Sequence, residues 1–305
     1  MYKRQRLDFT SAGESFPETK DDNDNSLAAA NQISLSKTYK GQMAENDDKD
    51  FYRFTLSKAG KIQVTANTYI DLNLHLYDAS GEEVDEWWGY VDSSTGKWTD
   101  KRLIKLVKAG TYYLCAERYD DRGNYSFSVA TFTPKITVKS SFTATAGGSS
   151  FDLNAKVNDD SEDLTYTSSN KKVVTVSSYG YVYIEGPGTA TITVGIKGLP
   201  VKKSVKVTVY PKKGYLSSVK TGKGYLKASW YRDSQASGYQ VLIARDSKFT
   251  KSKKSATITK NSSVSKTFSK LKRKATYYVK VRSYKTVGKT KLYGAYSSAK
   301  KVKVK

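Results

Sequence analysis

The chain has 305 residues, with 52 Lys and Arg against 29 Asp and Glu, one His and one Cys. A single cysteine excludes an internal disulfide framework and a four-thiolate metal site, and a single histidine excludes any site that needs two imidazoles. No apolar run reaches the roughly 20 residues of a membrane-spanning helix, so the chain is not expected to span a membrane. The length indicates about two or three domains, and a hydrophobic share of 38% is enough to form their cores.

Positive charge is concentrated in the last third of the chain. Residues 211–305 contain 26 Lys and Arg but only two acidic residues, Asp233 and Asp246, whereas residues 1–210 contain 26 basic and 27 acidic residues. This asymmetry indicates a polyanionic partner such as nucleic acid, teichoic acid or an acidic glycan; a solvated strand surface is the alternative. Lysine far outnumbers arginine, which favours diffuse attraction over base readout, so no sequence-specific nucleic-acid binding is expected. The residues predicted to bind an anionic polymer are Lys251, Lys253, Lys254, Lys270, Lys272, Arg273 and Lys274.

Residues 1–25 are predicted to be a disordered segment. Met1–Arg6 is basic, but the apolar core of a signal peptide does not follow it, and Asp8–Asn25 is polar and acidic. Met1–Gln5 also resembles a translated sequencing-library adapter. We therefore expect an artefactual start and a chain that is a fragment of a longer protein.

From Ser26 onward, apolar side chains alternate with polar ones at every second residue. Ile62, Val64 and Ala66 follow this pattern, as do Leu72–Leu76 and Tyr125–Val129. Such alternation buries one face of a strand, and no long helical period interrupts it. Prolines at 134 and 211 mark breaks between strand-rich units. The sequence predicts an all-β protein of three tandem β-sandwiches, at residues 26–132, 133–210 and 211–305.

The first unit contains three distinctive stretches. They are the acidic run and strand Asn46–Phe54, the strand and turn Leu74–Gly81, and the Gly-Thr-Tyr-Tyr strand start within Ala109–Leu114. Together they resemble the bacterial pre-peptidase C-terminal domain family. The resemblance implies a jelly-roll-like sandwich attached to secreted enzymes, often peptidases, and therefore an accessory domain. Some relatives bind calcium or matrix polymers.

The other two units carry motifs of different families. Leu164–Asn170, Val174–Val176 and Gly186–Val194 resemble a bacterial Ig-like group 2 domain, with Tyr166 where a Trp is usual. In the third unit, Trp230 on an early strand and the spacing from Leu271 to Tyr277 resemble fibronectin type III and its tyrosine corner.

Catalytic groups are sparse. The chain has no Gly-x-Ser-x-Gly, His-Glu-x-x-His or phosphate-loop motif. His75 lies out of phase with Leu74 and Leu76 and is expected to point to solvent. Cys115 is expected to be a half-buried, inert thiol. Glu82, Glu83 and Glu86 could serve a glycosidase only beside a cleft, and are expected to form a solvated acidic loop.

Calcium is the predicted ion. Asp47, Asp48 and Asp50 lie close together before a strand, with Asp21, Asp22 and Asp24 upstream. Calcium takes six to eight oxygen ligands, and such clusters supply several of them. The alternative is an acidic, soluble loop that caps the strand. No other cofactor is expected.

Three of the four tryptophans lie in one segment, at Glu82–Lys101, which is predicted to be a hairpin or a long loop. Neighbouring Trp87 and Trp88 cannot both face one core in an extended chain, so at least one is expected to be exposed. Exposed aromatic rings can stack on sugars or on partner proteins. The predicted ligand-binding residues are Trp87, Trp88, Tyr90 and Trp98, and the alternative is that all of them pack.

These patterns favour a non-catalytic, monomeric, modular protein that is extracellular, either secreted or associated with the cell wall. Its predicted role is adhesion and spacing, with a cell-wall polymer, a glycan or a surface protein as partner. The alternative is the C-terminal accessory region of a larger secreted hydrolase, a peptidase or glycosidase, whose catalytic domain is missing. An enzyme in its own right is the third hypothesis.

Overall fold

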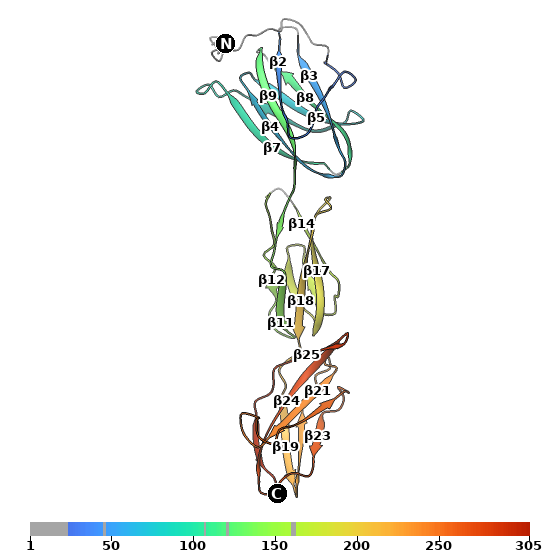
Figure 1. The fold of residues 1–305 in the computed structure, drawn as a ribbon, viewed down its shortest axis with the longest axis vertical. Helices are drawn as coiled ribbons and strands as arrows, with labels where there is room; N and C mark the ends of the chain where they lie inside the picture. Colours follow the sequence, from blue (N-terminus) through green and yellow to red (C-terminus); the bar gives the residue numbers. More distant parts are fainter. Residues whose placement is uncertain (1–23, 45–46, 107, 120–121, 160–162) are drawn as a thin grey trace. The chain divides into compact units, whose positions relative to one another are not determined.

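The computed structural model describes residues 24–44, 47–106, 108–119, 122–159 and 163–305. The chain forms two compact units: the first comprises the chain up to Pro134 together with Gly198–Pro200, and the second comprises Lys135–Lys197 and Val201–Lys305. Every regular element among the described residues is a strand (Figure 1). The predicted all-β class is therefore confirmed. None of these residues forms a helix with the length and apolarity that crossing a bilayer requires.

The first unit is a sandwich of two sheets. A five-stranded sheet has the order β1-β3-β8-β5-β6, and a four-stranded sheet has the order β2-β9-β4-β7. Successive strands mostly alternate between the two sheets, as in a jelly roll, which confirms the predicted architecture. The strands are β1 (Asn31–Gln32), β2 (Thr38–Met43), β3 (Lys49–Leu56), β4 (Gly60–Thr68), β5 (Leu72–Asp78), β6 (Glu83–Gly89), β7 (Trp98–Leu106), β8 (Gly110–Arg118) and β9 (Gly123–Phe132).

The core of this sandwich follows from the two-residue period. Leu74, Leu76 and Leu114 are fully buried on the inner face of one sheet, and Ile62 and Val64 on the inner face of the other. Alternate residues of the same strands point away from the core. The register of each strand thus decides which polar groups meet on the outer faces.

The start of the described chain covers part of an outer face. Leu27 and Ala30 pack against Phe51, Cys115 and aromatic neighbours on the outside of the five-stranded sheet. Asp24 is buried, and Asn25 accepts a hydrogen bond from the Lys49 amide at 3.2 Å. The segment predicted to be disordered is residues 1–25, of which residues 1–23 lie outside the described residues. For Asp24 and Asn25 the prediction is wrong, because they pack on this sheet.

The second unit holds two sandwiches. In the first of these, β11-β18-β17-β14 and β12-β16-β15 form the two main sheets, β11 pairs in parallel with β18, and β10 pairs with β13. Val182, Ile192 and Val207 are fully buried in this sandwich. Its strands are β10 (Ile136–Thr137), β11 (Ser141–Thr145), β12 (Phe151–Asp152), β13 (Lys156–Val157), β14 (Leu164–Ser168), β15 (Val174–Val176), β16 (Tyr181–Ile184), β17 (Gly188–Ile196) and β18 (Lys202–Tyr210).

The last sandwich packs a three-stranded sheet, β19-β20-β23, against a sheet ordered β22-β21-β24-β25, in which β26 also pairs with β24. The two sheets thus have three and five strands, and β25 and β26 pair with different stretches of β24. This arrangement is that of a fibronectin type III-like sandwich. Trp230, Val279 and Val281 lie in its core. The strands are β19 (Leu216–Gly222), β20 (Tyr225–Trp230), β21 (Gly238–Ala244), β22 (Lys254–Ile258), β23 (Ser265–Phe268), β24 (Thr276–Val287), β25 (Thr290–Tyr293) and β26 (Lys300–Lys303).

Candidate functional site

The predicted cationic residues gather at one end of the last sandwich. Ala244 at the end of β21 pairs with Tyr278 near the start of β24, so the loops 245–253 and 269–275 leave the sheets at the same end. This end also holds the last residues of the chain, because Thr276 pairs with Lys303 (Figure 1). We call it the basic pole, and define it by seven exposed side chains: Lys251, Lys253, Lys254, Lys270, Lys272, Arg273 and Lys274.

Both loops of the basic pole have a defined backbone. Asp246 accepts hydrogen bonds from the amides of Thr250 (2.9 Å) and Lys251 (2.6 Å), and the Thr250 hydroxyl donates to it at 2.8 Å. The Lys251 amide, with further donors from the loop, lowers the pKa of Asp246 below its usual value. In the other loop, the Lys272 amide donates to the Tyr277 hydroxyl at 3.3 Å, which is the predicted tyrosine corner. The cations therefore stand on fixed turns.

Backbone strain is concentrated in the same two loops. Among the described residues, six other than glycine have a positive φ, and four of these are Phe249, Ser252, Lys270 and Lys274. The left-handed conformation is unfavourable for such residues and tends to cluster at functional sites. It turns the two lysines out of the loop.

A row of stacked cations adjoins the basic pole on the outer face of β24. Lys280 Nζ lies 4.0 Å from the Phe249 ring centre and 4.4 Å from that of Tyr296. The Arg282 guanidinium lies 3.8 Å from the Tyr293 ring centre. Burial, together with neighbouring Lys253 and Arg282, lowers the pKa of Lys280. The site prediction omitted Lys280 and Arg282, although the alternation along β24 already places both on the outer face.

The aromatic segment of the first sandwich separates into buried and exposed rings. Trp87 is 6% exposed and packs in the core, with the Arg102 guanidinium 5.7 Å from its ring centre. Trp88 and Tyr90 are 50% and 60% exposed. Trp98 is half-buried against the core. The predicted ligand contact is wrong for Trp87, because the strand period turns its ring inward; Trp88 and Tyr90 remain available.

The segment that carries these rings is not a hairpin. β6 lies at the edge of the five-stranded sheet and β7 at the edge of the four-stranded sheet, so residues 90–97 connect the two sheets. Within this connection, Asp92 accepts hydrogen bonds from the Ser94 amide at 2.7 Å and the Thr95 amide at 3.2 Å. Neither alternative describes the whole of Glu82–Lys101, because β6 and β7 occupy its two ends and the loop is limited to residues 90–97.

The residues predicted to bind calcium divide between two faces. Asp47 and Asp50 are buried, at 1% and 2% exposed, and Asp24 joins them at 3%. Asp48 instead faces out and forms an ion pair with Arg118 at 2.5 Å. The Tyr125 hydroxyl donates to Asp50, and Asn31 donates to Asp24 at 2.7 Å. Asp21 and Asp22 lie outside the described residues. Asp48 is therefore separated from the other two predicted ligands, and calcium stays a prediction.

The predictions for His75, Cys115 and two glutamates need correction. His75 lies on the outer face as expected, but its side chain is only 12% exposed, because Glu83 and Glu117 cover it. Glu83 and Glu86 belong to β6 rather than to a solvated loop. Cys115 is 1% exposed, not half-buried, and burial raises the pKa of its thiol.

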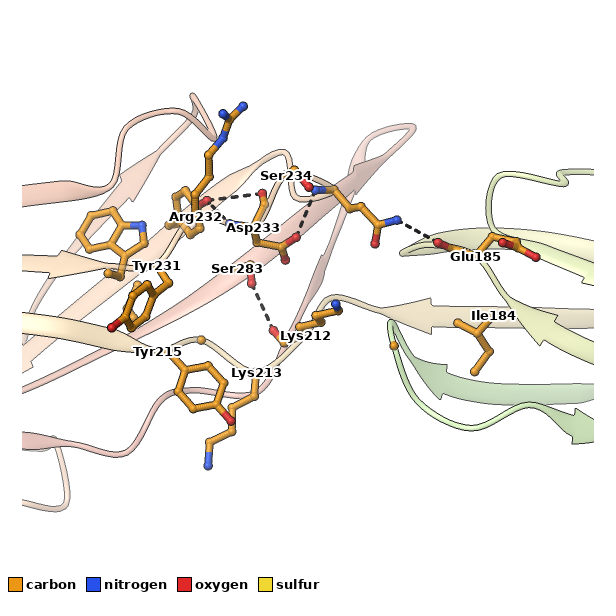
Figure 2. A pocket seen from close by; sticks show the side chains of 16 residues that line it. Ile184, Glu185, Lys212, Lys213, Tyr215, Tyr231, Arg232, Asp233, Ser234 and Ser283 are labelled. Carbon is orange, nitrogen blue, oxygen red and sulfur yellow. Dashed lines mark hydrogen bonds between the residues drawn. The ribbon is translucent and has the colours of Figure 1, made fainter.

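A shallow pocket in the second unit offers little reactive chemistry. Figure 2 shows Tyr215, Tyr231 and Arg232 among its labelled lining residues. Its lining includes no histidine or cysteine, and the Ser283 hydroxyl donates to the Lys212 carbonyl at 3.1 Å. No hydrogen bond joins a hydroxyl or amine of the described lining to one of its carboxylate side chains, so the pocket carries no catalytic proposal.

Comparisons with known proteins match part of the first sandwich to a domain family. Residues 48–117 match the family model of the bacterial pre-peptidase C-terminal domain, which confirms the resemblance found in the sequence. No curated protein matches the chain. Domains of this family typically form the C-terminal region of secreted peptidases, which supports an extracellular, modular role.

Three of the matching solved structures contain segments that are similar to parts of this chain. The pre-peptidase C-terminal domain of collagenase from Bacillus anthracis is 28% identical, with 33% of this chain and 93% of that one covered and a TM-score of 0.27. The chicken CNTN1 FN1-FN3 domains are 14% identical (82% and 96% covered, TM-score 0.27). The chicken interferon gamma receptor alpha chain is 12% identical (38% and 65% covered, TM-score 0.26). Because these TM-scores are low, the fold described above rests on the chain's own strand pairing.

Proposed function

We propose that the chain is a non-catalytic extracellular attachment protein that holds an anionic polymer through the basic pole. The observation that carries the proposal is the meeting of seven exposed cations from two loops at one end of a sandwich. The one carboxylate in these loops, Asp246, accepts hydrogen bonds from its own turn. One acidic side chain against seven cations leaves this end of the sandwich strongly positive.

The form of this charge suits a polymer better than a small anion. Each exposed ion pair contributes only about 0–1 kcal/mol, so useful affinity requires many pairs formed together. Lysines on separate turns can follow a flexible chain of repeated phosphates or carboxylates, as in teichoic acids or acidic glycans. The other sandwiches would serve as spacers.

Salt dependence provides the test. The full chain is passed over immobilised teichoic acid, hyaluronan and uncharged dextran at increasing salt. Exposed charges are screened within about 8 Å at physiological ionic strength, so retention on the two anionic polymers should collapse as salt rises. Equal retention on dextran, or retention that salt does not change, would contradict the proposal.

A second candidate is carbohydrate binding by the first sandwich. Its support is the pair of exposed rings at Trp88 and Tyr90, two residues apart on the outer face of the β6 edge. Such rings stack on the apolar faces of sugars. Binding of a neutral glycan on an array, lost in Trp88→Ala and unaffected by salt, would distinguish this role from polymer attachment.

The family match favours a wider context for either role. Because domains of this kind typically accompany secreted peptidases, we propose as an alternative that the chain is the accessory part of a larger secreted hydrolase. Determining the coding sequence upstream of residue 1 tests this. A catalytic domain there would support the alternative, and a signal peptide with no catalytic domain between it and residue 1 would refute it.

A further inference from the structure

A β-bulge gathers unlike ligand groups at the outer edge of the five-stranded sheet. Leu76 pairs with Asp85 while Tyr77 pairs with Glu83, so Val84 is an extra residue in β6. Without the bulge, Glu83 and Glu86 would point to opposite faces of the strand, because they are three residues apart. The extra residue turns Glu83 to the face of Glu86, opposite His75 on β5.

The three side chains converge on a single point. His75 Nδ1 lies 2.6 Å from Glu83 Oε1 and 3.9 Å from Glu86 Oε2, and the three ligand atoms all lie within 4.8 Å of one another. In a tetrahedral zinc site with bonds of about 2.0–2.2 Å, neighbouring ligand atoms lie about 3.3 Å or slightly more apart. One of the two distances from His75 Nδ1 is shorter than this value and the other is longer. We propose that His75, Glu83 and Glu86 bind a divalent transition-metal ion, for which zinc is the best match.

The surroundings of His75 are those of a metal ligand. Its other ring nitrogen, Nε2, lies 3.3 Å from Glu117 Oε2, within ion-pair distance but without hydrogen-bond geometry, and Lys49 Nζ holds that carboxylate at 3.1 Å. A histidine that ligates a metal usually donates its second N–H to a carboxylate, which fixes the tautomer and the ring orientation. The Tyr77 ring lies parallel to the imidazole, with 6.1 Å between centres and 13° between planes. Glu117 and Tyr77 thus flank the imidazole, and Nδ1 faces the two glutamates. A metal bound at Nδ1 would leave the second N–H on Nε2, beside the Glu117 carboxylate.

The local charge favours a cation. Three carboxylates surround one imidazole, and Lys49 offsets only one of them. Imidazole with carboxylates suits zinc better than calcium or magnesium, which prefer oxygen alone. The three side chains leave room for a water or for a group of a partner as the fourth ligand.

The test uses the tag-free full chain, titrated with zinc in millimolar calcium so that all-oxygen sites are filled. Calorimetry should show a single site, and isotope-edited NMR should show a shift of the imidazole resonances, which belong to His75 alone. His75→Gln should abolish this binding. Glu117→Gln should weaken it by about 10–100-fold, the usual effect of removing a carboxylate behind a ligating histidine.

Glu82→Gln is the matched control, because Glu82 precedes Glu83 in the chain and lies outside the cluster. It should bind zinc as the parent chain does. Imidazole resonances unmoved at saturating zinc, or equal affinity in His75→Gln, would overturn the proposal. The NMR result comes from the unmodified chain, so it decides the matter even where a variant fails to fold.

Discussion

The two charged regions of the molecule are built in different ways. On the first sandwich, β5, β6 and β8 bring His75, Glu83 and Glu117 together through strand register, with contacts of 2.6 and 3.3 Å. At the basic pole, the seven cations stand on two loops and project from turns. Groups fixed by a sheet can match the geometry of one small ion, whereas charges spread over turns suit a long and variable polyanion. The two proposed sites thus differ in kind, with a compact cluster on the face of one sandwich and a spread of charge at the end of another.

The largest expected change is in the stability of the first sandwich, and it differs between two neighbouring tryptophans. Trp87→Ala removes a ring that packs in the core and should lower the free energy of unfolding of the first sandwich by about 3–5 kcal/mol. Trp88→Ala removes a half-exposed ring and should change it by less than about 0.5 kcal/mol. Denaturant unfolding measures both. Equal losses would show that the strand is turned differently.

Cys115 tests whether the early segment covers the outer face. The buried thiol, whose pKa burial raises, should react with a thiol reagent about a hundredfold or more slowly than in the unfolded chain. Ala30→Glu, which places a charge in the packed cluster, should speed the reaction, whereas Ser80→Glu on an exposed turn should not. A thiol that reacts rapidly in the parent chain would contradict this packing.

The smallest effect concerns the turn under the basic pole. Because hydrogen bonds lower the pKa of Asp246 in the folded state, its contribution to stability is present above the ordinary value of 3.8 and is lost as the pH falls through the lowered one. Acidification should therefore lower the protection factors of the Thr250 and Lys251 amides, which compare observed exchange with the intrinsic rate at the same pH, and Asp246→Ala should lower them at neutral pH. Titration of Asp246 at its ordinary pKa would show that the turn is not formed.

Much of the fold follows from the sequence because period-two alternation is a local signal. It places Leu74 and Leu76 inside, and the Leu271–Tyr277 spacing indicates the corner that later appears as a hydrogen bond from Lys272. Chain order alone does not show which strands become neighbours. The residues before Trp98 resemble a hairpin, yet β6 and β7 enter different sheets.

The same limit applies to the candidate sites. The basic pole was predictable in composition, but the meeting of its two loops depends on the pairing of β21 with β24. The contact between His75 and Glu83 was not predictable from the sequence, because it depends on one extra residue, Val84. This residue forms a bulge that interrupts the two-residue alternation of the strand. The sequence groups Asp47 with Asp48, but only the structure shows that Asp47 is buried while Asp48 faces out and pairs with Arg118.

The central claim is that the location of the lysines at the basic pole, rather than their number, binds an anionic polymer. Two variants of equal net charge test it on immobilised teichoic acid at low salt. One changes Lys251, Lys253, Lys272 and Lys274 to Glu, and the other changes Lys213, Lys260, Lys266 and Lys289, exposed lysines away from the pole, to Glu. The account predicts that the first variant loses about tenfold or more in affinity, since four exposed ion pairs together supply about 1 kcal/mol or more, while the second stays close to the parent chain. Equal losses in the two variants would contradict it.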